Sequence, residues 1–521
     1  MRLTDVLSDP KIFARKGYAT PLFDVAKVRE KTYKQPTWVH FGAGNIFRAF
    51  LAAMLQKALE DGHDTGVIVA ESFDYEIIER AYTPFDNLSL LVTLGGDGSV
   101  KKSVIASVTE SLRAGFEFED WARLVEIFRN PSLQMVSFTI TEKGYQVAAD
   151  DLTRGLNPVS AMGKIAVLLH ERMKAGNLPI TLQSMDNCSR NGDLLKDAVL
   201  QYAKNWTKAG ITSDDFLDYL EKNVKYPLSM IDKITPFPDS EVKRQLEADG
   251  FEDTELIVTA KGSHTAAFVN AEETEYLVMS SDYANGHPPL ERYGAIFTDR
   301  ETVDKVEKMK VCTCLNPLHT ALAIFGCLLG YTRICEEMKD PDLVALITKM
   351  GYDEALPVVI NPGVIKPADF INAVITKRLP NPFMPDAPQR IATDTSQKLA
   401  IRFGVTLKSY DLKGLSVENL RFIPLTLAAY GRYLCGVNDS GTKFTPSPDP
   451  KLAELSRIVA NLDIHSTDND FSVLKELYSN VDVFGVDLYK LGLGERIEEM
   501  TRNLYNGVGA VRRVLQEMLK D

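Results

Sequence analysis

The sequence of 521 residues is poor in cysteine, has no excess of basic residues and shows no apolar run suited to spanning a bilayer. Its six cysteines stand at irregular spacing, which excludes the disulfide framework of a small secreted domain. Its net charge is −12, whereas a protein that binds nucleic-acid backbones needs a basic face. The N-terminus has no apolar core of signal-peptide length. These absences predict a cytoplasmic protein that binds neither nucleic acid nor membrane.

The length of the chain predicts two or three domains, because 521 residues exceed what one hydrophobic core usually holds. Residues 36–145 alternate strand-like and helix-like patterns, which indicates a parallel α/β sheet. The expected strands lie within 38–44, 66–73, 88–94 and 135–141, and a helix is expected over 50–60. From about residue 300, apolar residues recur with helical spacing. We therefore predict an α/β domain over 1–297 and a mostly α-helical domain over 298–521.

A glycine turn, HFGAGNIFRAF, follows the first expected strand and precedes a helix. In a dinucleotide-binding turn, Gly42 would permit the tight bend and Gly44 would let the backbone approach a pyrophosphate at the helix N-terminus. Phe47 stands where the third glycine of the GxGxxG motif is expected. An ordinary strand–glycine–helix turn is therefore the alternative interpretation.

A carboxylate at the end of the second expected strand supports the nucleotide interpretation. Glu71 lies 27 residues after Gly44, near the distance at which an acidic residue holds the adenosine ribose 2′-hydroxyl. Such a carboxylate would repel a 2′-phosphate, so Glu71 favours NAD over NADP. Asp74 is the alternative acid, and a solvated carboxylate at a strand end is the simpler explanation of either residue.

Polar side chains also follow the strand-like run LPITLQ, in the segment SMDNCSRNG. Asp186, Asn187 and Asn191 would stand at the carboxyl end of a strand, where α/β proteins assemble their sites. A polar turn held by its own Asx side chains explains the same segment. In MIDKITP, Asp232 and Lys233 most simply form a local ion pair.

A second cationic pair, Arg390 and Lys398, is eight residues apart, which corresponds to about 80° around an ideal helix. The two side chains would suit an anionic substrate, or they would form an ordinary solvated helix face.

The segment KVCTCLNPLH permits two readings. Cys312, Cys314 and His319 would supply three zinc ligands, but a zinc site needs about four, and no CxxC or HxxxH partner occurs elsewhere. The cysteines then read as small buried hydrophobic residues. Asn316 and His319, spaced i, i+3, would share a helix face. Lys310 lies one or two turns upstream, and a desolvated lysine can act as a general acid/base.

Six segments in this order resemble the polyol-specific long-chain dehydrogenase/reductase (mannitol dehydrogenase) family over roughly residues 36–510. They are GAGNIFR, TITEKGY, SMDNCSRNG, MIDKITP, KVCTCLNPLH and RIATDTSQKL. The glycine turn is nearer to the hexuronate branch than to the mannitol enzymes. The resemblance implies a Rossmann-type N-terminal domain, a helical C-terminal domain and zinc-independent hydride transfer with NAD.

The activity that the resemblance implies is interconversion of D-fructuronate and D-mannonate. Tagaturonate reduction and mannitol oxidation are the alternatives within the family, and a nucleotide-binding protein without catalysis is the alternative of another class. The expected partner is a small hexuronate or polyol, and monomer and dimer both remain open.

The resemblance also implies roles for individual residues. Lys310 would exchange the proton of the reacting oxygen, with Glu307 relaying protons to water. Asn187 and Asn316 would hold that oxygen, and His319 would orient the substrate. The residues that would bind NAD are Gly42, Gly44, Asn45, Ile46, Phe47, Arg48 and Glu71, and those that would bind substrate are Asn191, Asp232, Arg390 and Lys398.

The spacing around Lys310 departs from the family pattern. Asn316 follows it by six residues, whereas the family has five. One extra residue turns a side chain by about 100° on an ideal helix. A π-bulge between Lys310 and Asn316 would take up one residue and restore the facing, and the sequence leaves open whether one forms.

Overall fold

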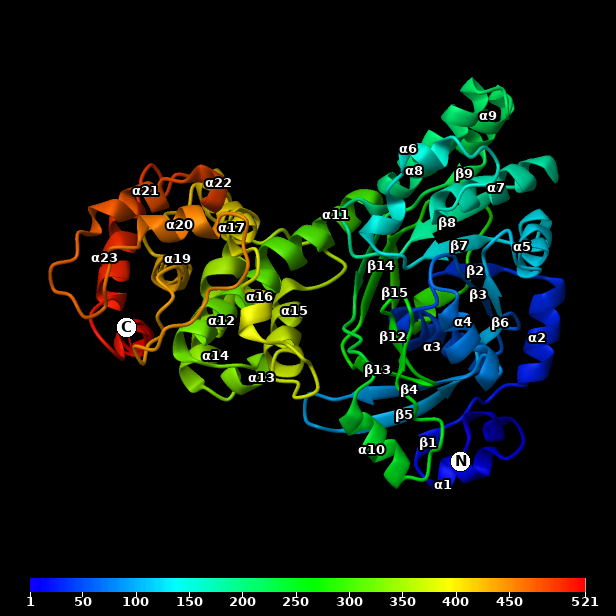
Figure 1. Cartoon of the computed structure of the whole chain (residues 1–521), viewed down its shortest axis with the longest axis horizontal. Helices are drawn as coiled ribbons and strands as arrows, with labels where there is room; N and C mark the ends of the chain where they lie inside the picture. Colours follow the sequence, from blue (N-terminus) through cyan, green and yellow to red (C-terminus); the bar gives the residue numbers. More distant parts are fainter. Residues whose placement is uncertain (521) are drawn as a thin grey trace. The chain divides into compact units, whose positions relative to one another are not determined.

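The computed structural model describes residues 1–520 and divides into two compact units (Figure 1). The first comprises Met1–Gly95 and Ser99–Asp304, and the second comprises Gly96–Gly98 and Lys305–Asp521. The first unit holds the β-sheets, and the second is built almost entirely of helices. The prediction of an α/β fold followed by a mostly helical part is confirmed.

The first unit is organised around a six-stranded parallel sheet in the order β6-β3-β2-β7-β8-β9. Numbered by their occurrence in the chain, these strands have the order 3-2-1-4-5-6, which is that of the Rossmann dinucleotide-binding fold. The order in which the chain adds strands therefore reverses between β2 and β7, while the strands stay parallel. The loops after these two strands flank the crevice where such sheets bind ligands. The strands are β2 Trp38–Phe41, β3 Val67–Glu71, β6 Val108–Arg113, β7 Met135–Phe138, β8 Ile180–Ser184 and β9 Val224–Lys225.

Helices cover both faces of this sheet (Figure 1). Val39 and Phe41 of β2 point into a core shared with α5, α7, α8 and α9, whereas Trp38 points into the opposite core with α3 and α4. Because helices cover both faces, every residue of the inner strands β2, β3, β7 and β8 is buried, rather than every second one. These helices are α3 Ala53–Glu60, α4 Glu76–Ala81, α5 Asp120–Arg129, α7 Ala161–Lys174, α8 Asn191–Lys208 and α9 Asp214–Lys222.

The strand predicted over 88–94 forms, as β4 (Ser89–Leu94), but it does not join the parallel sheet. It pairs antiparallel with β5 (Val100–Ile105), because a short turn closed by the bond from Gly95 N–H to Ser99 O joins the two strands. It therefore lies in a second sheet, β1-β5-β4-β13, whose other members are β1 Tyr18–Ala19 and β13 Phe268–Glu272. The third parallel strand in the chain is instead β6.

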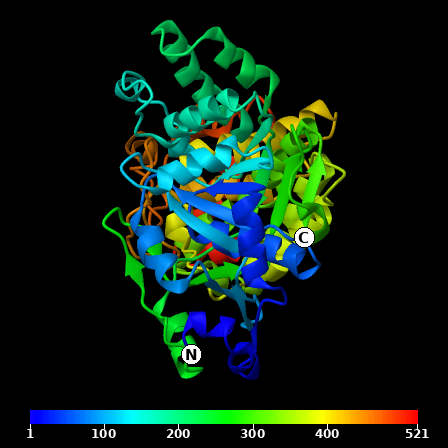
Figure 2. The same ribbon diagram turned by 90° about the vertical axis from the view of Figure 1, so that its right-hand side faces the viewer.

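The first unit also contains a third sheet, a β-hairpin and an N-terminal segment. A third sheet has the order β10-β14-β15, and β11 and β12 form a hairpin. The N-terminal ammonium lies beside the segment that follows α10, because it donates to Gly250 O at 2.7 Å; both views show these segments together (Figures 1 and 2). The bounds are β10 Ser229–Asp232, β11 Ile257–Val258, β12 His264–Thr265, β14 Tyr276–Ser280, β15 Ala295–Thr298, α1 Pro10–Arg15, α2 Val25–Lys34, α6 Ala149–Leu152 and α10 Ser240–Ala248.

The second unit packs around α12, whose apolar residues are buried on every side. The helical stretch Arg300–Leu329, which contains α12, is long and apolar enough to cross a membrane, yet 78% of its most apolar window is buried inside the protein, as in a core helix. The helices are α11 Arg300–Met309, α12 Asn316–Leu329, α13 Ile334–Glu337, α14 Pro341–Lys349, α15 Pro367–Ala373, α16 Pro388–Ile391, α17 Thr395–Leu399, α18 Val405–Leu412, α19 Phe422–Tyr433, α20 Leu452–Ile458, α21 Leu474–Tyr478, α22 Val481–Phe484, α23 Gly494–Leu504 and α24 Ala510–Lys520.

Candidate functional site

The two glycines of the turn after β2 meet different surroundings. Gly42 has a φ of +110°, and a Cβ there would stand 2.2 Å from the carbonyl oxygen of Thr139, so the fold itself requires glycine. Gly44 has no protein atom within 4 Å of the position that a Cβ would take, and it lies outside the left-handed φ range. No contact among residues 1–520 accounts for a glycine at this position, which lies at the N-terminus of a helix and at the crevice of the sheet. A pyrophosphate that approaches the backbone does explain it, so these residues fit a dinucleotide.

Phe47 takes the place of the third glycine by stacking on a buried histidine. Its ring lies 4.2 Å from that of His40, centroid to centroid, with the planes 8° apart. His40 is held by the hydroxyls of Ser137 and Thr139, at 2.6 and 2.8 Å. Burial lowers the pKa of His40 to about 3, so the ring is neutral. Close packing of helix on strand, which the third glycine usually permits, is achieved here by an aromatic pair.

Arg48 and Asn45 fasten the first helical turn to residues 264–266. The buried Arg48 guanidinium donates to Ala266 O at 2.7 Å and to the Thr265 hydroxyl at 2.6 Å. It also donates to Asn45 Oδ1, and Asn45 in turn donates to His264 O. The contacts that these two side chains make are therefore with the protein, and they fix the turn that precedes them. Ile46 is half-buried against the apolar core on the same side of the sheet.

The structure distinguishes the two acidic residues at the end of β3. Glu71 accepts hydrogen bonds from the N–H groups of Ala43, at 2.9 Å, and of Phe73 and Asp74. Asp74 instead accepts the hydroxyls of Thr259 and Ser263 in the β11–β12 hairpin. A carboxylate offers about four acceptor positions, so Glu71, which touches the glycine turn, retains one for a ribose hydroxyl.

The loops after β7 and β8 are joined by Asp186. Its carboxylate accepts the N–H groups of Ile140 and Thr141, at 3.0 and 2.8 Å, and the Tyr145 hydroxyl at 2.6 Å. Thr141 has a φ of +64°, which is strained for a β-branched residue and is held by this contact. The motifs TITEKGY and SMDNCSRNG therefore form one structure, and the exposed Asn187 directly follows its central carboxylate.

Asn191 and Asp232 are both buried in the first unit and lie on different segments. Asn191 is fully buried, donates to Asp186 O and to Ser229, and accepts the Ser229 N–H. These are the contacts of a residue that holds the loop after β8 to β10, and its role as a substrate ligand stays a prediction. Asp232 is a buried residue at the end of β10. The ion pair expected between Asp232 and Lys233 is replaced by one from Lys233 to Glu275, at 2.9 Å.

In the second unit, a π-bulge is present between Lys310 and Asn316. Residues Lys310–Cys314 form the π-helix η6, and the Leu315 N–H bonds to Lys310 O, five residues back, at 3.1 Å. The surplus residue is thus taken up in the helix, which answers the question that the spacing raised. Lys310 is buried, with 4% of its surface exposed, and Glu307 precedes it by one turn on α11.

His319 lies on the first turns of α12 with one ring nitrogen unused. Its buried Nε2 has no hydrogen-bond partner among the described residues and stands 3.6 Å from Asp386 Oδ2. Burial lowers the pKa of His319 to about 4 against the opposing effect of Asp386, so the ring is neutral. A neutral ring with an unsatisfied buried nitrogen is suited to bond a ligand hydroxyl. Asp386 is itself paired with Arg390.

The helix expected to carry both Arg390 and Lys398 is broken between them, so the angle of about 80° does not apply. The helix α16 ends at Ile391, Asp394 has a φ of +54°, and α17 begins at Thr395. Lys398 donates to the carbonyl oxygens of Ile391 and Thr393, which end α16. Burial and the neighbouring Arg402 lower its pKa. Arg402, which sequence reasoning missed, thus belongs to the same cationic group.

Cys312 and Cys314 are buried, as their reading as small hydrophobic residues predicted. Burial raises the pKa of Cys314 to about 12, which keeps it a thiol. Among residues 1–520, no group of three or more His, Cys, Asp or Glu side chains is arranged to hold a metal ion.

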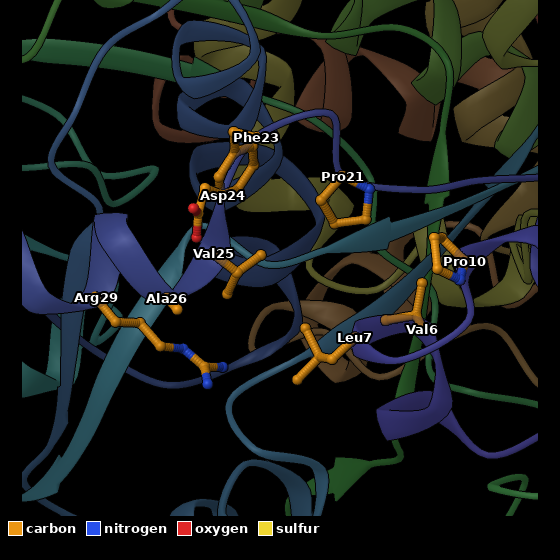
Figure 3. Close-up of a pocket in the computed structure, with 9 residues that line it drawn as sticks. All are labelled: Val6, Leu7, Pro10, Pro21, Phe23, Asp24, Val25, Ala26 and Arg29. Carbon is orange, nitrogen blue, oxygen red and sulfur yellow. The ribbon is translucent and has the colours of Figure 1, made fainter.

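A cavity of about 550 Å³ in the first unit lies away from these groups (Figure 3). Its two charged side chains are already engaged: Asp24 accepts the Lys27 N–H at the start of α2, and Arg29 bonds to Asp86. The remaining walls are apolar or proline, so the cavity offers no acid/base pair. Its lining comprises Val6, Leu7, Pro10, Pro21, Phe23, Asp24, Val25, Ala26 and Arg29.

Comparison with known proteins yields two family models that together match most of the chain. The mannitol dehydrogenase Rossmann domain matches residues 36–291, and the mannitol dehydrogenase C-terminal domain matches residues 302–504. D-mannonate oxidoreductase of Thermotoga maritima is 49% identical over 535 aligned residues, covering 100% of this chain and 99% of that protein.

Two solved structures share the fold over nearly their whole length. Mannitol 2-dehydrogenase of Pseudomonas fluorescens, in a ternary complex with NAD and D-mannitol, is 24% identical, with a TM-score of 0.69 and 100% of both chains covered. D-sorbitol dehydrogenase in its substrate-free form is 23% identical, with a TM-score of 0.79 and 95% of this chain and 97% of that chain covered.

Proposed function

The chain belongs to the mannitol dehydrogenase family, and we propose that it interconverts D-fructuronate and D-mannonate with NAD. Family membership makes it an oxidoreductase that acts on a CH–OH group. The choice of substrate is carried by the relative named D-mannonate oxidoreductase, which aligns with the whole chain at 49% identity. The cationic side chains near His319 support the same choice, because a uronate carries a carboxylate.

The cofactor is proposed to bind at the crevice of the parallel sheet. Gly44 leaves its backbone open, and Glu71 accepts a ribose hydroxyl while it holds the glycine turn through Ala43. When bound, NAD supplies the chemistry of hydride transfer. The cofactor-binding segment comprises Gly42, Gly44, Asn45, Ile46, Phe47 and Arg48.

Lys310 is proposed as the acid/base. In the reductive direction its ammonium donates a proton to the C5 carbonyl oxygen of the ketose, and in the oxidative direction the neutral amine takes the proton back. Its burial keeps bulk water from competing for that proton. Glu307, one turn earlier, is proposed to relay protons between Lys310 and water.

The remaining groups are proposed to hold the substrate. Asn187 and Asn316 donate to the reacting oxygen as its negative charge develops, the role of an oxyanion hole. His319 orients the substrate through its unsatisfied Nε2. Hydroxyl and carboxylate groups are bound by Asn191, Asp232, Arg390 and Lys398.

The test is oxidation of NADH, followed by absorbance, with D-fructuronate, D-tagaturonate or D-fructose as the ketose. We expect the highest kcat/KM with fructuronate. Faster reduction of tagaturonate or fructose would transfer the assignment to tagaturonate reduction or mannitol oxidation. NADH binding without turnover of any of the three would favour a nucleotide-binding protein that has lost catalysis. A cytoplasmic location and a monomeric or dimeric state form part of the same proposal.

A further inference from the structure

Arg402 is a half-buried cation whose guanidinium makes few contacts with the protein. It lies in the π-helix η10 (Ala400–Gly404) and makes one hydrogen bond, from Nη1 to the Thr320 hydroxyl at 2.5 Å. Thr320 follows His319 in the chain and donates in turn to the carbonyl oxygen of Asn316 at 2.8 Å. Arg402 is therefore connected, through one hydroxyl, to the segment that carries both proposed substrate-contacting groups of α12.

The guanidinium of Arg402 has no carboxylate partner among residues 1–520, although burial lowers its pKa to about 10. A purely structural arginine in the same unit looks different. Arg432 is fully buried and donates to the carbonyl oxygens of Leu504, Val437 and Asn438. A charge that is partly removed from water is stabilised by a counter-charge, so the unmatched guanidinium of Arg402, which is half-buried, is suited to bind an anion that the protein itself does not supply.

The surroundings of Arg402 favour an anion as well. Its charge lowers the pKa of both His319 and Lys398, which places it within electrostatic range of each. The carboxylate beside His319, Asp386, is already paired with Arg390. Positive charge therefore exceeds negative charge around the unsatisfied nitrogen of His319.

We propose that Arg402 binds the carboxylate of the substrate and selects sugar acids over uncharged polyols. The planar fork of a guanidinium matches a carboxylate with two parallel hydrogen bonds, which a neutral CH₂OH group cannot accept. This inference rests on the proposed function and adds to it the residue that recognises the acid end of the hexuronate. Lys398 and Arg390 then remain for the hydroxyl groups.

The test compares Arg402→Gln with the wild-type enzyme and with Arg457→Gln, a matched control at an exposed arginine on α20. Glutamine retains an N–H donor for Thr320 but removes the charge. We expect the KM for D-fructuronate to rise about 10- to 100-fold, since charge-assisted hydrogen bonds are lost, with a smaller change in kcat. Calorimetric titration with D-mannonate in the presence of cofactor should show a matching loss of affinity. The preference for D-mannonate over D-mannitol should therefore not increase in Arg402→Gln.

The outcomes separate the inference from the function on which it rests. A wild-type enzyme that reduces no ketose would defeat the proposed function itself. An active wild type whose KM for fructuronate is unchanged by Arg402→Gln, or is raised more by Arg390→Gln, would defeat only the role of Arg402. If thermal unfolding shows that Arg402→Gln does not fold, Arg402→Lys decides: it keeps the charge but loses the fork, and a KM equal to that of wild type would refute the proposal.

Discussion

Replacing Gly44 by alanine tests whether the turn after β2 binds a dinucleotide, and Gly42→Ala is its control. The added methyl at position 44 meets no protein atom within 4 Å, and the φ of Gly44 is one that alanine adopts. Alanine restricts the unfolded chain more than glycine does, so we expect the free energy of unfolding to rise by about 0.4–1 kcal/mol. The folded protein should thus tolerate this change fully.

The same substitution at Gly42 should have the opposite effect on stability. Its φ of +110° is strained for alanine, and the methyl would lie 2.2 Å from the Thr139 carbonyl oxygen, at the end of β7. The strain and the forced displacement together should lower the free energy of unfolding by about 2–4 kcal/mol. Thermal or denaturant unfolding of the two variants measures this contrast without any ligand.

Gly44→Ala, which should leave the protein stable, should nevertheless weaken the binding of NADH. The methyl of Gly44→Ala occupies the space through which a pyrophosphate would approach the helix N-terminus, so we expect a loss of affinity of about tenfold or more, or about 1.4 kcal/mol. Quenching of protein fluorescence by NADH gives the dissociation constant. A stable Gly44→Ala variant that binds NADH as tightly as the wild type would refute the dinucleotide reading of this turn.

Three further predictions concern the acid/base, the cofactor and acid stability. Lys310→Ala should lower kcat about 10²- to 10⁴-fold while NADH binding persists; unchanged turnover would point to Lys308 or another group. Glu71→Gln should raise the kcat/KM for NADPH relative to that for NADH, because the charge that repels a 2′-phosphate is removed; an unchanged ratio would contradict this. Burial depresses the pKa of His40 to about 3 and that of His319 to about 4, below the unfolded value near 6.5. Their contribution to stability is therefore complete above pH 6.5 and is lost as pH falls, toward 4 for His319 and toward 3 for His40, by about 1.4 kcal/mol per pH unit for each. His40→Gln should flatten this slope in denaturant unfolding, and an equal slope would show that other groups control it.

Three of the strands that sequence patterns identified, β2, β3 and β7, are buried on both faces. They are mostly apolar because helices cover each side of them, and such runs are conspicuous in a sequence. β6 was not predicted from the sequence because it is an edge strand that carries polar residues, which contact side chains outside the core. Its Glu110 pairs with Arg123, and its Arg113 pairs with Asp120. These ion pairs join residues 7 to 13 apart in the chain, and no local pattern reveals them.

Candidate site residues can be proposed from residue type and order in the sequence, but their contacts cannot. Asn191 and Arg48 occupy expected motifs, yet both are buried and bonded to the protein, since a polar residue that holds a loop has the same letter as one that holds a ligand. Arg402 gave the converse result: its sequence context carries no motif, and only its unmatched guanidinium sets it apart. The surplus residue after Lys310 is visible in the sequence as a spacing, but only the structure shows that a π-bulge takes it up.

The π-helices of the described chain explain why spacing alone is an uncertain guide to this site. A π-turn inserts one residue, which would otherwise rotate every following side chain by about 100°. Five such segments occur among residues 1–520, and four of them hold a residue of the cofactor turn, the acid/base or the cationic group near His319. These four are Arg48, Lys310, Arg402 and Arg378, whose charge, like that of Arg402, lowers the pKa of His319. Because a π-turn gives up regular backbone hydrogen bonding, its recurrence at these positions is more readily explained by the side chains that it aims than by the stability of the helices.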